Sequence, residues 1–217
     1  LHALYRYKNL QVSSELLARE ACEIEIEILK EPIGKQDQYA AAHGGLNLIR
    51  FSLNGDVKVE PIIMEQKAYN QLQNNLLLFY TGITRNASDV LNDQKYNIAN
   101  DQEKFDTQVK MVNLIEESKK YLCESDLEGF GKTLDKNWQL KKNLSNNISN
   151  KNIDDLYSLA IKNGALGGKL LGAGGGGFLL FYCEPQNQNN LRSSLRQLKE
   201  IDFMFDDSGS VLIQLNH

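Results

Sequence analysis

The sequence contains little cysteine and no long apolar run. Cys22, Cys123 and Cys183 are far apart and odd in number, and no C-x-x-C or other metal-ligand spacing occurs. This usage argues against a disulfide framework and is typical of a reducing compartment, so we expect a cytoplasmic protein. The longest apolar runs, such as Leu76 to Tyr80, are far too short to cross a bilayer, so we expect no membrane partner.

An excess of positive charge is also absent, because the formal net charge is -4 at pH 7. That balance argues against nucleic acid or an anionic membrane as the main partner. A hydrophobic fraction of 41% and a charged fraction of 24% are ordinary for a globular protein. The length of 217 residues allows one large domain or two small ones.

Glycine is abundant, and it is concentrated in GALGGKLLGAGGGGFLLFY, Gly164 to Tyr182. Eight of the sixteen glycines fall in this stretch, four of them consecutive at 174–177. Glycine weakens helices and strands, so this density indicates a backbone that turns tightly or approaches another group closely. Adjacent N–H groups in such a turn can converge on an anion such as phosphate. A plain turn between two core strands is the alternative, but it needs only one or two glycines.

Two common nucleotide-binding loops do not fit these glycines. Gly172, Gly174 and Gly177 satisfy G-x-G-x-x-G, but a dinucleotide fingerprint requires a helix after them. The apolar run FLLFY that follows predicts a buried strand instead. A Walker A loop requires Gly-Lys-Ser/Thr at its end, which is missing. We therefore expect a strand, a glycine-rich loop and a second strand.

Elsewhere helices and strands alternate. Ser13 predicts the start of a helix that Pro32 stops at about residue 31, although EIEIEIL also alternates like a strand. A β-hairpin is predicted around Asn54-Gly55. We further expect a strand at 76–80, helices from about 84 and over 98–124, 126–142, 153–163 and 187–199, and a second hairpin turning at 208–209. Strands that return as hairpins favour an α+β fold with a largely antiparallel sheet.

Three expectations concern side chains on these helices. Val109, Val112 and Ile115 form an apolar stripe on the helix over 98–124. Trp138, the only tryptophan, is expected in the core. The pair at 141 and 142 is expected to be an exposed, lysine-rich helix end.

The segment GKQDQY, Gly34 to Tyr39, concentrates polar groups in a predicted loop before a short helix through residues 40–42. It combines a glycine, a lysine, two amides, a carboxylate and a phenol. A carboxylate such as Asp37 beside Lys35 stays ionised and can accept a hydroxyl proton as that proton leaves. A lone aspartate in a loop is more often a turn or cap residue, and that alternative stays open.

Four blocks resemble the GHMP sugar and isoprenoid kinase superfamily. In chain order they are GKQDQYAAAHGGLN, LLFYTGITRNAS, LDKNWQLKKNLSNNIS and GALGGKLLGAGGGGFLLFY. Within the superfamily the first two blocks are most similar to the D-glycero-D-manno-heptose phosphate kinases, and the resemblance covers nearly the whole chain. It implies a phosphotransferase with ATP and a sugar phosphate as partners and ATP and Mg²⁺ as cofactors, which phosphorylates a hydroxyl of a heptose phosphate.

The resemblance also implies the domain organisation. Residues 1–66 would be the remainder of an N-terminal domain similar to ribosomal S5 domain 2. Residues 67–217 would be the ferredoxin-like C-terminal domain of a GHMP kinase. The fold class is then α+β, in agreement with the pattern of elements. A homodimer stays open.

Residue roles follow from the resemblance by position. The family's aspartate maps onto Asp37, which would orient or deprotonate the acceptor hydroxyl, with Lys35 assisting beside the sugar. A helix glutamate would bind Mg²⁺, with Glu25 the first choice and Glu27 the second; for either, a solvated helix face is the alternative. The substrate-binding residues would be Gly34, Gln36, Thr81, Gly82 and Arg85. The nucleotide phosphates would lie near Lys169, Gly172, Ala173, Gly174, Gly175, Gly176 and Gly177.

Two of these residues have a plain alternative. Arg85 suits bidentate binding of a sugar phosphate, and a surface ion pair is the alternative. Lys169 would face either phosphate or solvent.

One family motif is not in the sequence. The superfamily's Gly/Ser-rich loop, P-x-x-x-G-L-G-S-S, normally precedes the helix with which this chain opens. We therefore expect a piece of a longer protein, with weak ATP binding and no turnover by itself. The rival interpretations are another GHMP sugar kinase, acting on galactose or fucose, and a non-catalytic remnant that serves as a binding module.

Overall fold

The computed structural model describes residues 1–84 and 86–213. The chain divides into two compact units. The N-terminal unit comprises Leu1–Ile62 together with the chain from Phe205 onward, and the C-terminal unit comprises Ile63–Met204. The last segment, which we expected within a domain over 67–217, packs with the N-terminal unit.

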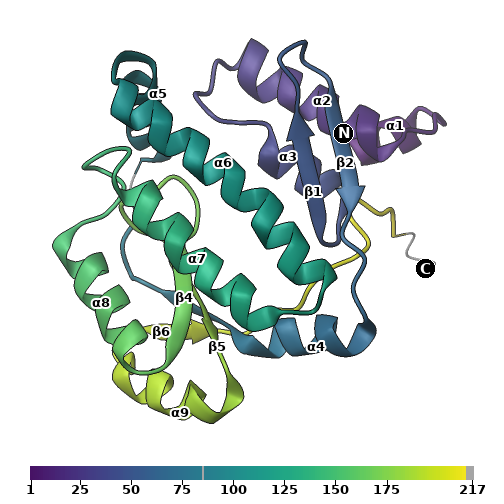
Figure 1. Cartoon of the computed structure of the whole chain (residues 1–217). Helices are drawn as coiled ribbons and strands as arrows, with labels where there is room; N and C mark the ends of the chain where they lie inside the picture. The colour runs from purple at the N-terminus through teal and green to yellow at the C-terminus, as the bar shows by residue number, and fades with distance from the viewer. Residues whose placement is uncertain (85, 214–217) are drawn as a thin grey trace. The chain divides into compact units, whose positions relative to one another are not determined.

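The N-terminal unit consists of helices and one hairpin (Figure 1). Its elements are α1 (His2–Tyr7), α2 (Ser14–Cys22), the π-helix η1 (Glu23–Ile28), α3 (Gln36–His43), β1 (Asn47–Phe51) and β2 (Val57–Pro61). Helices α2 and α3 pack together around a small core, which includes Leu17, Ala18, Cys22, Tyr39 and Ala42.

A helical path through α2 and η1 confirms the helix predicted here. Ser13 is the N-cap, and its hydroxyl accepts a hydrogen bond from the Leu16 N–H at 3.2 Å. The segment EIEIEI forms a π-helix rather than the alternative strand. Such segments are rare and often occur at functional sites.

Strands β1 and β2 form the predicted hairpin. They pair antiparallel from Asn47 opposite Pro61 to Phe51 opposite Val57. Gly55 in the turn has a φ of 91°, a conformation that glycine adopts without steric cost.

The C-terminal unit is a four-stranded sheet covered by helices (Figure 1). Its elements are α4 (Gln66–Asn75), β3 (Leu76–Tyr80), α5 (Ala87–Asn100), α6 (Gln102–Cys123), α7 (Leu127–Lys142), α8 (Lys151–Lys162), β4 (Ala165–Leu170), β5 (Phe178–Cys183), α9 (Pro185–Ser194) and β6 (Lys199–Ile201). The strand order is β4-β5-β3-β6, and every neighbouring pair is antiparallel. From β3 to β6 the chain runs strand, helices, strand, strand, helix, strand, which is the order of a ferredoxin-like motif.

The core of this unit lies between the sheet and its helices. Phe79 of β3 and Phe181 of β5 are buried, with ring centroids 6.2 Å apart. Trp138 of α7 is 0% exposed, which confirms its predicted core position. Its ring lies 5.8 Å from that of Tyr157 on α8, so α7 and α8 meet over the same core.

The expected stripe on α6 is not a buried face. Val109, Val112 and Ile115 are 43%, 53% and 43% exposed. The buried residues of this helix are Thr107 and Leu122. The spacing of apolar residues predicted the helix correctly, but it did not predict which face of the helix is buried.

The second hairpin, expected over 203–215, is wrong for the described residues 203–213, which form no strand. The preceding strand β6, Lys199–Ile201, pairs with β3. The following chain lies against α3 and β1 instead, where the Gly45 N–H donates to the Asp206 carbonyl at 2.7 Å. Gly44 and Gly209 allow the two backbone segments to approach closely, because a Cβ on Gly44 would lie 2.1 Å from the Gly209 nitrogen. The glycine at the expected turn thus serves contact between two backbones.

Two helices differ from their predicted bounds. Helix α5 begins at Ala87 rather than near residue 84, because the Asn86 side chain caps it by accepting from the Ser88 N–H at 3.1 Å. Helix α9 begins at Pro185, a residue suited to the first helical position, and ends at Ser194.

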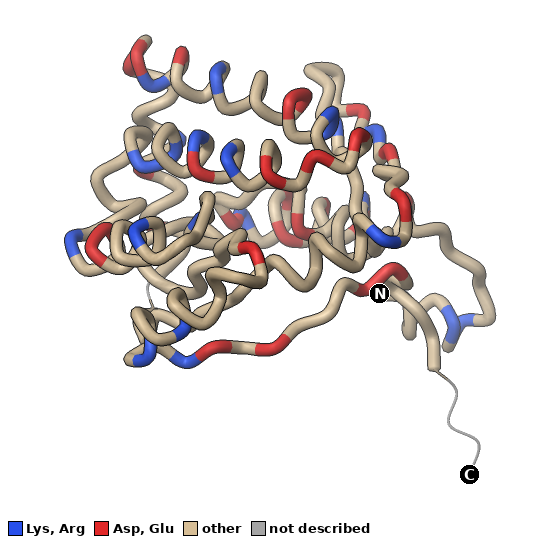
Figure 2. The backbone as a smooth tube through the Cα atoms, turned by 60° about the horizontal axis from the view of Figure 1, so that its bottom comes forward, with Lys and Arg blue, Asp and Glu red and all other residues tan. Residues whose placement is uncertain are grey.

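Within the described residues, no helix has the length and apolar character that crossing a membrane requires. Figure 2 shows acidic and basic residues interspersed along the backbone, in keeping with the net charge of -4.

Candidate functional site

Helix α3 carries the polar segment around Asp37. The helix begins at Gln36, with Lys35 as its N-cap residue, so Asp37 lies in the first helical turn rather than in the predicted loop. Lys35, Gln36 and Asp37 are exposed, whereas Gln38 and Tyr39 are buried. Residues two apart on a helix do not face each other, so Lys35 and Asp37 diverge.

Asp37 lines a cavity of about 610 Å³, named here the Asp37 cavity. Glu25 of η1 lines the same cavity, although the two residues come from different helical segments. Gln38, the residue after Asp37, contacts Glu25, because its Nε2 donates a hydrogen bond to Glu25 Oε2. The buried Gln38 Oε1 has no hydrogen-bond partner among the described residues. Two carboxylates and an unpaired amide oxygen therefore meet at one cavity.

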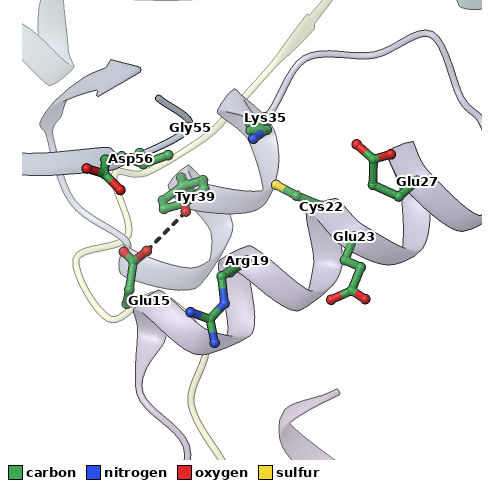
Figure 3. Close-up of a pocket in the computed structure, with 10 residues that line it drawn as sticks. Glu15, Arg19, Cys22, Glu23, Glu27, Lys35, Tyr39, Gly55 and Asp56 are labelled. Carbon is green, nitrogen blue, oxygen red and sulfur yellow. Dashed lines mark hydrogen bonds between the residues drawn. The ribbon is translucent and has the colours of Figure 1, made fainter. Parts of the chain in front are cut away.

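Lys35 lines a second cavity of about 560 Å³, named here the Lys35 cavity and shown in Figure 3. Its lining comes from α2, η1, α3 and the turn between β1 and β2, and includes Cys22, Glu23, Glu27, Lys35 and Tyr39. The structure thus brings Glu25 and Asp37 together but separates Lys35 and Glu27 from them.

Tyr39 in the Lys35 cavity is held by hydrogen bonding. Its hydroxyl donates to Glu15 Oε1 at 3.1 Å, as the dashed line in Figure 3 marks. Burial and this carboxylate raise the pKa of Tyr39 to about 12. The phenol is therefore a neutral donor at physiological pH and helps to join α2 to α3.

The Asp37 cavity fits a metal held partly by its substrate. No group of three or more His, Cys, Asp or Glu side chains in residues 1–84 and 86–213 could hold a metal ion. Magnesium is usually bound through one or two carboxylates with substrate phosphates completing its shell. Glu25 and Asp37 supply that number of carboxylates, which are hard oxygen ligands of the kind Mg²⁺ prefers.

The glycine-rich segment forms the predicted strand, loop and strand. Its loop, residues 171–177, joins the antiparallel strands β4 and β5. Gly172, Gly174, Gly175 and Gly177 have φ values of 79°, 129°, 76° and 101°. Gly176 is needed for space instead, because a Cβ there would lie 2.5 Å from the Ile83 carbonyl oxygen. These five glycines therefore fix the backbone path of the loop.

Neighbouring segments anchor this loop. The Gly175 N–H donates to the Ile148 carbonyl at 2.8 Å, and the Gly177 N–H donates to the Ile83 carbonyl at 2.8 Å. The Thr81 hydroxyl donates to the Gly177 carbonyl at 2.8 Å, so this side chain, predicted to bind substrate, braces the loop.

Four amide groups of the loop remain available. Within the described part of the chain, no hydrogen bond uses the N–H of Gly172, Ala173, Gly174 or Gly176. Successive free N–H groups of a turn form an anion-binding concavity. Free N–H groups of this kind are what a phosphate-facing loop requires, and that role stays a prediction.

Two lysines border the loop. Lys169 of β4 is half-buried, and burial lowers its pKa. Lys141, at the end of α7, donates from Nζ to the Gly172 carbonyl at 2.7 Å. Burial, together with the charge of Lys169, lowers the pKa of Lys141 to about 8. The expectation that Lys141 is an ordinary exposed helix end is therefore wrong.

The remaining predicted residues have mixed positions. Gly34 and Gly82 are exposed, and Gly82 has a φ of 74°. Arg85 lies outside the described residues. The Asp37 cavity and the glycine-rich loop belong to different compact units.

Comparison with known proteins shows what this chain is similar to. Residues 118–200 match the family model described as GHMP kinases C terminal. Over 96% of its length the chain is 34% identical to D-glycero-alpha-D-manno-heptose 7-phosphate kinase of Campylobacter jejuni. Residues 118–200 therefore resemble the C-terminal part of GHMP kinases. It spans 62% of the length of that Campylobacter relative.

Two further proteins similar to this chain differ in the sugar that their names give. A crystal structure of a D-glycero-D-manno-heptose 1-phosphate kinase from Bacteroides thetaiotaomicron has 27% identity and a TM-score of 0.66, covering 96% of this chain and 58% of its own. A bifunctional fucokinase/GDP-fucose pyrophosphorylase of Arabidopsis thaliana is 26% identical over 92% of this chain and 19% of its own length.

Sequence reasoning missed two residues of the candidate site. Gln38 is one of two glutamines flanking Asp37, and only the structure shows that it contacts Glu25. Lys141 is one of two adjacent lysines, and its neighbour Lys142 forms an ordinary ion pair with Asp154 at 3.2 Å. The sequence shows two adjacent lysines at the end of a predicted helix. It does not show which of the two side chains points toward the glycine-rich loop.

Proposed function

We propose that this chain is part of an ATP-dependent kinase that phosphorylates a hydroxyl group of a heptose phosphate. The match of residues 118–200 to the GHMP kinases C terminal model supports the general chemistry, and the 34% identity to a heptose 7-phosphate kinase over 96% of the chain supports the sugar. The whole protein would act in the cytoplasm, where ATP is available.

The observation that carries the proposal is the meeting of Asp37 and Glu25 at one cavity. Phosphoryl transfer needs a group that orients the attacking hydroxyl and positive charge that neutralises the phosphate oxygens. One carboxylate can serve the hydroxyl and the other can hold the metal. Gln38 supports this division, because its hydrogen bond holds the Glu25 carboxylate, which lines the same cavity as Asp37.

In the proposed mechanism, Asp37 accepts a hydrogen bond from the acceptor hydroxyl and takes its proton. The hydroxyl oxygen forms a bond to the γ-phosphorus, and the bond from that phosphorus to the bridging oxygen of ADP breaks. Mg²⁺, held by Glu25 and phosphate oxygens, would neutralise charge on the phosphates. An exposed Asp37 in the first turn of α3 can reach a substrate without rearrangement of the core.

Other residues keep proposed roles as contacts. We assign the glycine-rich loop to the phosphates, since its free N–H groups can donate to them. Lys35, which lines the separate Lys35 cavity, would contact the sugar together with Gly34 and Gln36. Substrate contacts are also proposed for Thr81, Gly82 and Arg85.

Substrate preference of the full-length protein tests the proposal. ATP turnover is measured with D-glycero-D-manno-heptose 7-phosphate, the corresponding 1-phosphate, galactose and fucose. We expect the highest kcat/KM with a heptose phosphate. Turnover of fucose alone would favour the second candidate, a fucose kinase, which the likeness to the Arabidopsis fucokinase supports. Turnover of none of the four would contradict the proposed activity and favour a binding module.

A matched pair of glutamates tests the metal site. Glu25→Gln removes a carboxylate from the Asp37 cavity, whereas Glu27→Gln removes one from the Lys35 cavity, two residues along the same π-helix. We expect Glu25→Gln to raise the Mg²⁺ concentration for half-maximal activity by about 10-fold or more, as loss of one charged ligand contact implies. Equal effects of the two variants would contradict the assignment of Glu25.

A further inference from the structure

Lys141 and Lys169 are two lysines at the glycine-rich loop without an acidic partner. Neither forms an ion pair with any residue in 1–84 or 86–213. Other lysines of α7 do have acidic partners, since Lys132 pairs with Glu128, and Lys136 with Glu117 at 3.2 Å. Lys141 and Lys169 thus border the loop, from the end of α7 and from strand β4, without an acidic partner among the described residues.

The Lys141 ammonium has unused hydrogen-bonding capacity. It has three N–H donors, and one of them is used by the Gly172 carbonyl at 2.7 Å. Its side chain is half-buried, and this hydrogen bond lies at the protein surface. The hydrogen bond therefore aims the ammonium at the loop while leaving two donors that a ligand from solution can reach.

Lys169 faces α7 from the sheet. Alternate residues of a strand share a face, so Lys169 lies on the same face as Gly167. Gly167 packs closely on α7, because a Cβ there would lie 2.0 Å from the Gly131 carbonyl oxygen. The charge of Lys169 acts on Lys141 strongly enough to lower the Lys141 pKa. Two like charges are therefore held near each other in partly dehydrated surroundings.

Such a pair is costly without an anion. Desolvation and like charge both disfavour the ammonium form, and a bound anion offsets both effects. The adjacent N–H groups of Gly172, Ala173 and Gly174 are free within the described residues and also favour negative charge. Lysine is a common point-charge ligand of phosphate.

We propose that Lys141, together with Lys169 and the free N–H groups at Gly172–Gly174, binds a phosphoryl group of a substrate. The proposal deepens the proposed kinase function, but binding can be measured without turnover, so the two can fail separately. The phosphoryl group would belong to the nucleotide or to the phosphate that a sugar phosphate already carries. Lys141 would then hold a phosphate in place rather than take part in proton transfer.

The geometry gives this site a distinctive pH dependence. The groups facing Lys141 are Lys169 from β4 and the Gly172 carbonyl, and the 171–177 loop carries no titratable side chain. The neighbouring Lys142 is paired with Asp154 of α8. Phosphate binding should raise the pKa of Lys141 above about 8, and affinity should fall as pH rises through that value.

Direct titration with inorganic phosphate tests the proposal. The full chain is labelled with ¹³Cε-lysine, and NMR follows each lysine signal from pH 7 to pH 11 with and without phosphate; the Lys141 signal is assigned from its absence in Lys141→Arg. We expect phosphate to shift the Lys141 titration upward and to leave that of Lys142 in place. An unchanged Lys141 titration at saturating phosphate, pyrophosphate and ADP would overturn the proposal.

Variants make the test independent of folding defects. Lys141→Met should weaken phosphate binding by about 10-fold or more in calorimetry, which is the effect expected for a charged hydrogen bond. Lys141→Arg should keep most of the affinity and show a shallower fall above pH 8, since arginine stays charged. The matched control Lys142→Met should bind like the wild type. Wild-type affinity in a folded Lys141→Met protein would overturn the proposal.

Two ligands identify the source of the phosphoryl group. Metal-free ADP and D-glycero-D-manno-heptose 7-phosphate are titrated into the wild type and Lys141→Met. Dependence on Lys141 for ADP alone assigns the site to the nucleotide, and dependence for the sugar phosphate alone assigns it to the acceptor. Dependence for neither ligand would overturn the proposal, whatever the turnover assay gives.

Discussion

At the scale of single residues, polar groups that lack internal partners mark the candidate site. Gln38 Oε1 is buried without a hydrogen-bond partner in the described chain, next to the Glu25 carboxylate. Lys141 and Lys169 are lysines without a described acidic partner. Buried polar groups are nearly always satisfied in proteins, so these exceptions indicate places where a ligand or water completes the site.

Lys141 should lower stability at neutral pH. Its pKa of about 8 lies below the unfolded value of 10.5, so the unfolded chain binds more protons between these values and stability rises with pH across that window. Lys141→Met removes this cost and should stabilise the chain at pH 7 by on the order of 1 kcal/mol, after allowance for solvent exposure and the lost hydrogen bond.

Urea unfolding in phosphate-free buffer at pH 7 and pH 10 measures this effect. The stability difference between Lys141→Met and the wild type should shrink at pH 10, where the wild-type lysine is neutral in the folded state. Lys142→Met is the control, because Lys142 is paired with Asp154. A difference that is the same at both pH values would contradict the origin assigned to it.

At the scale of elements, the sequence predicted correctly those features that depend on interactions between neighbouring residues. The Ser13 cap, the Asn54-Gly55 turn and the strand at 76–80 were all confirmed, since each depends on a few adjacent residues. The buried side of α6 and the path after Met204 depend on long-range packing, and both expectations were wrong. The features of the candidate site also differ in whether local sequence predicts them. The glycine-rich loop could be predicted from its composition, whereas the separation of Lys35 from Asp37 required the start of α3.

The glycine-rich loop gives a prediction at this scale. Gly176→Ala would place its Cβ 2.5 Å from the Ile83 carbonyl oxygen and should cost about 1–3 kcal/mol, as other overpacked sites do. Gly172→Ala meets no atom within 4 Å and should cost only about 1 kcal/mol for its positive φ. Thermal unfolding of the two variants compares these costs, and equal losses would contradict the packing described for residue 176.

At the scale of the whole molecule, two compact units share one chain whose last segment returns to the first unit. Asp206 and Gly209 supply that connection through backbone contacts with Gly45 and Gly44. The chain spans about three fifths of the heptose 7-phosphate kinase that it resembles, at 62% of its length. We therefore propose the activity for the whole protein and propose that this chain supplies its catalytic carboxylate.

Removal of the returning segment should loosen one unit. Deletion of residues 205–217 takes away the carbonyl that accepts from the Gly45 N–H at 2.7 Å. We expect faster amide hydrogen exchange in α3 and β1 and unchanged exchange in β3 and β5, because these strands belong to the C-terminal unit. Faster exchange in both units to the same extent would contradict this division.

We propose that Asp37 serves the acceptor hydroxyl in phosphoryl transfer. This role is tested by kcat for heptose phosphate in the full-length protein, comparing wild type, Asp37→Asn and the exposed control Asp155→Asn on α8. We expect a loss in kcat of about 10²–10⁴-fold for Asp37→Asn with its fold retained, and none for the control. Wild-type kcat in a folded Asp37→Asn protein would contradict it.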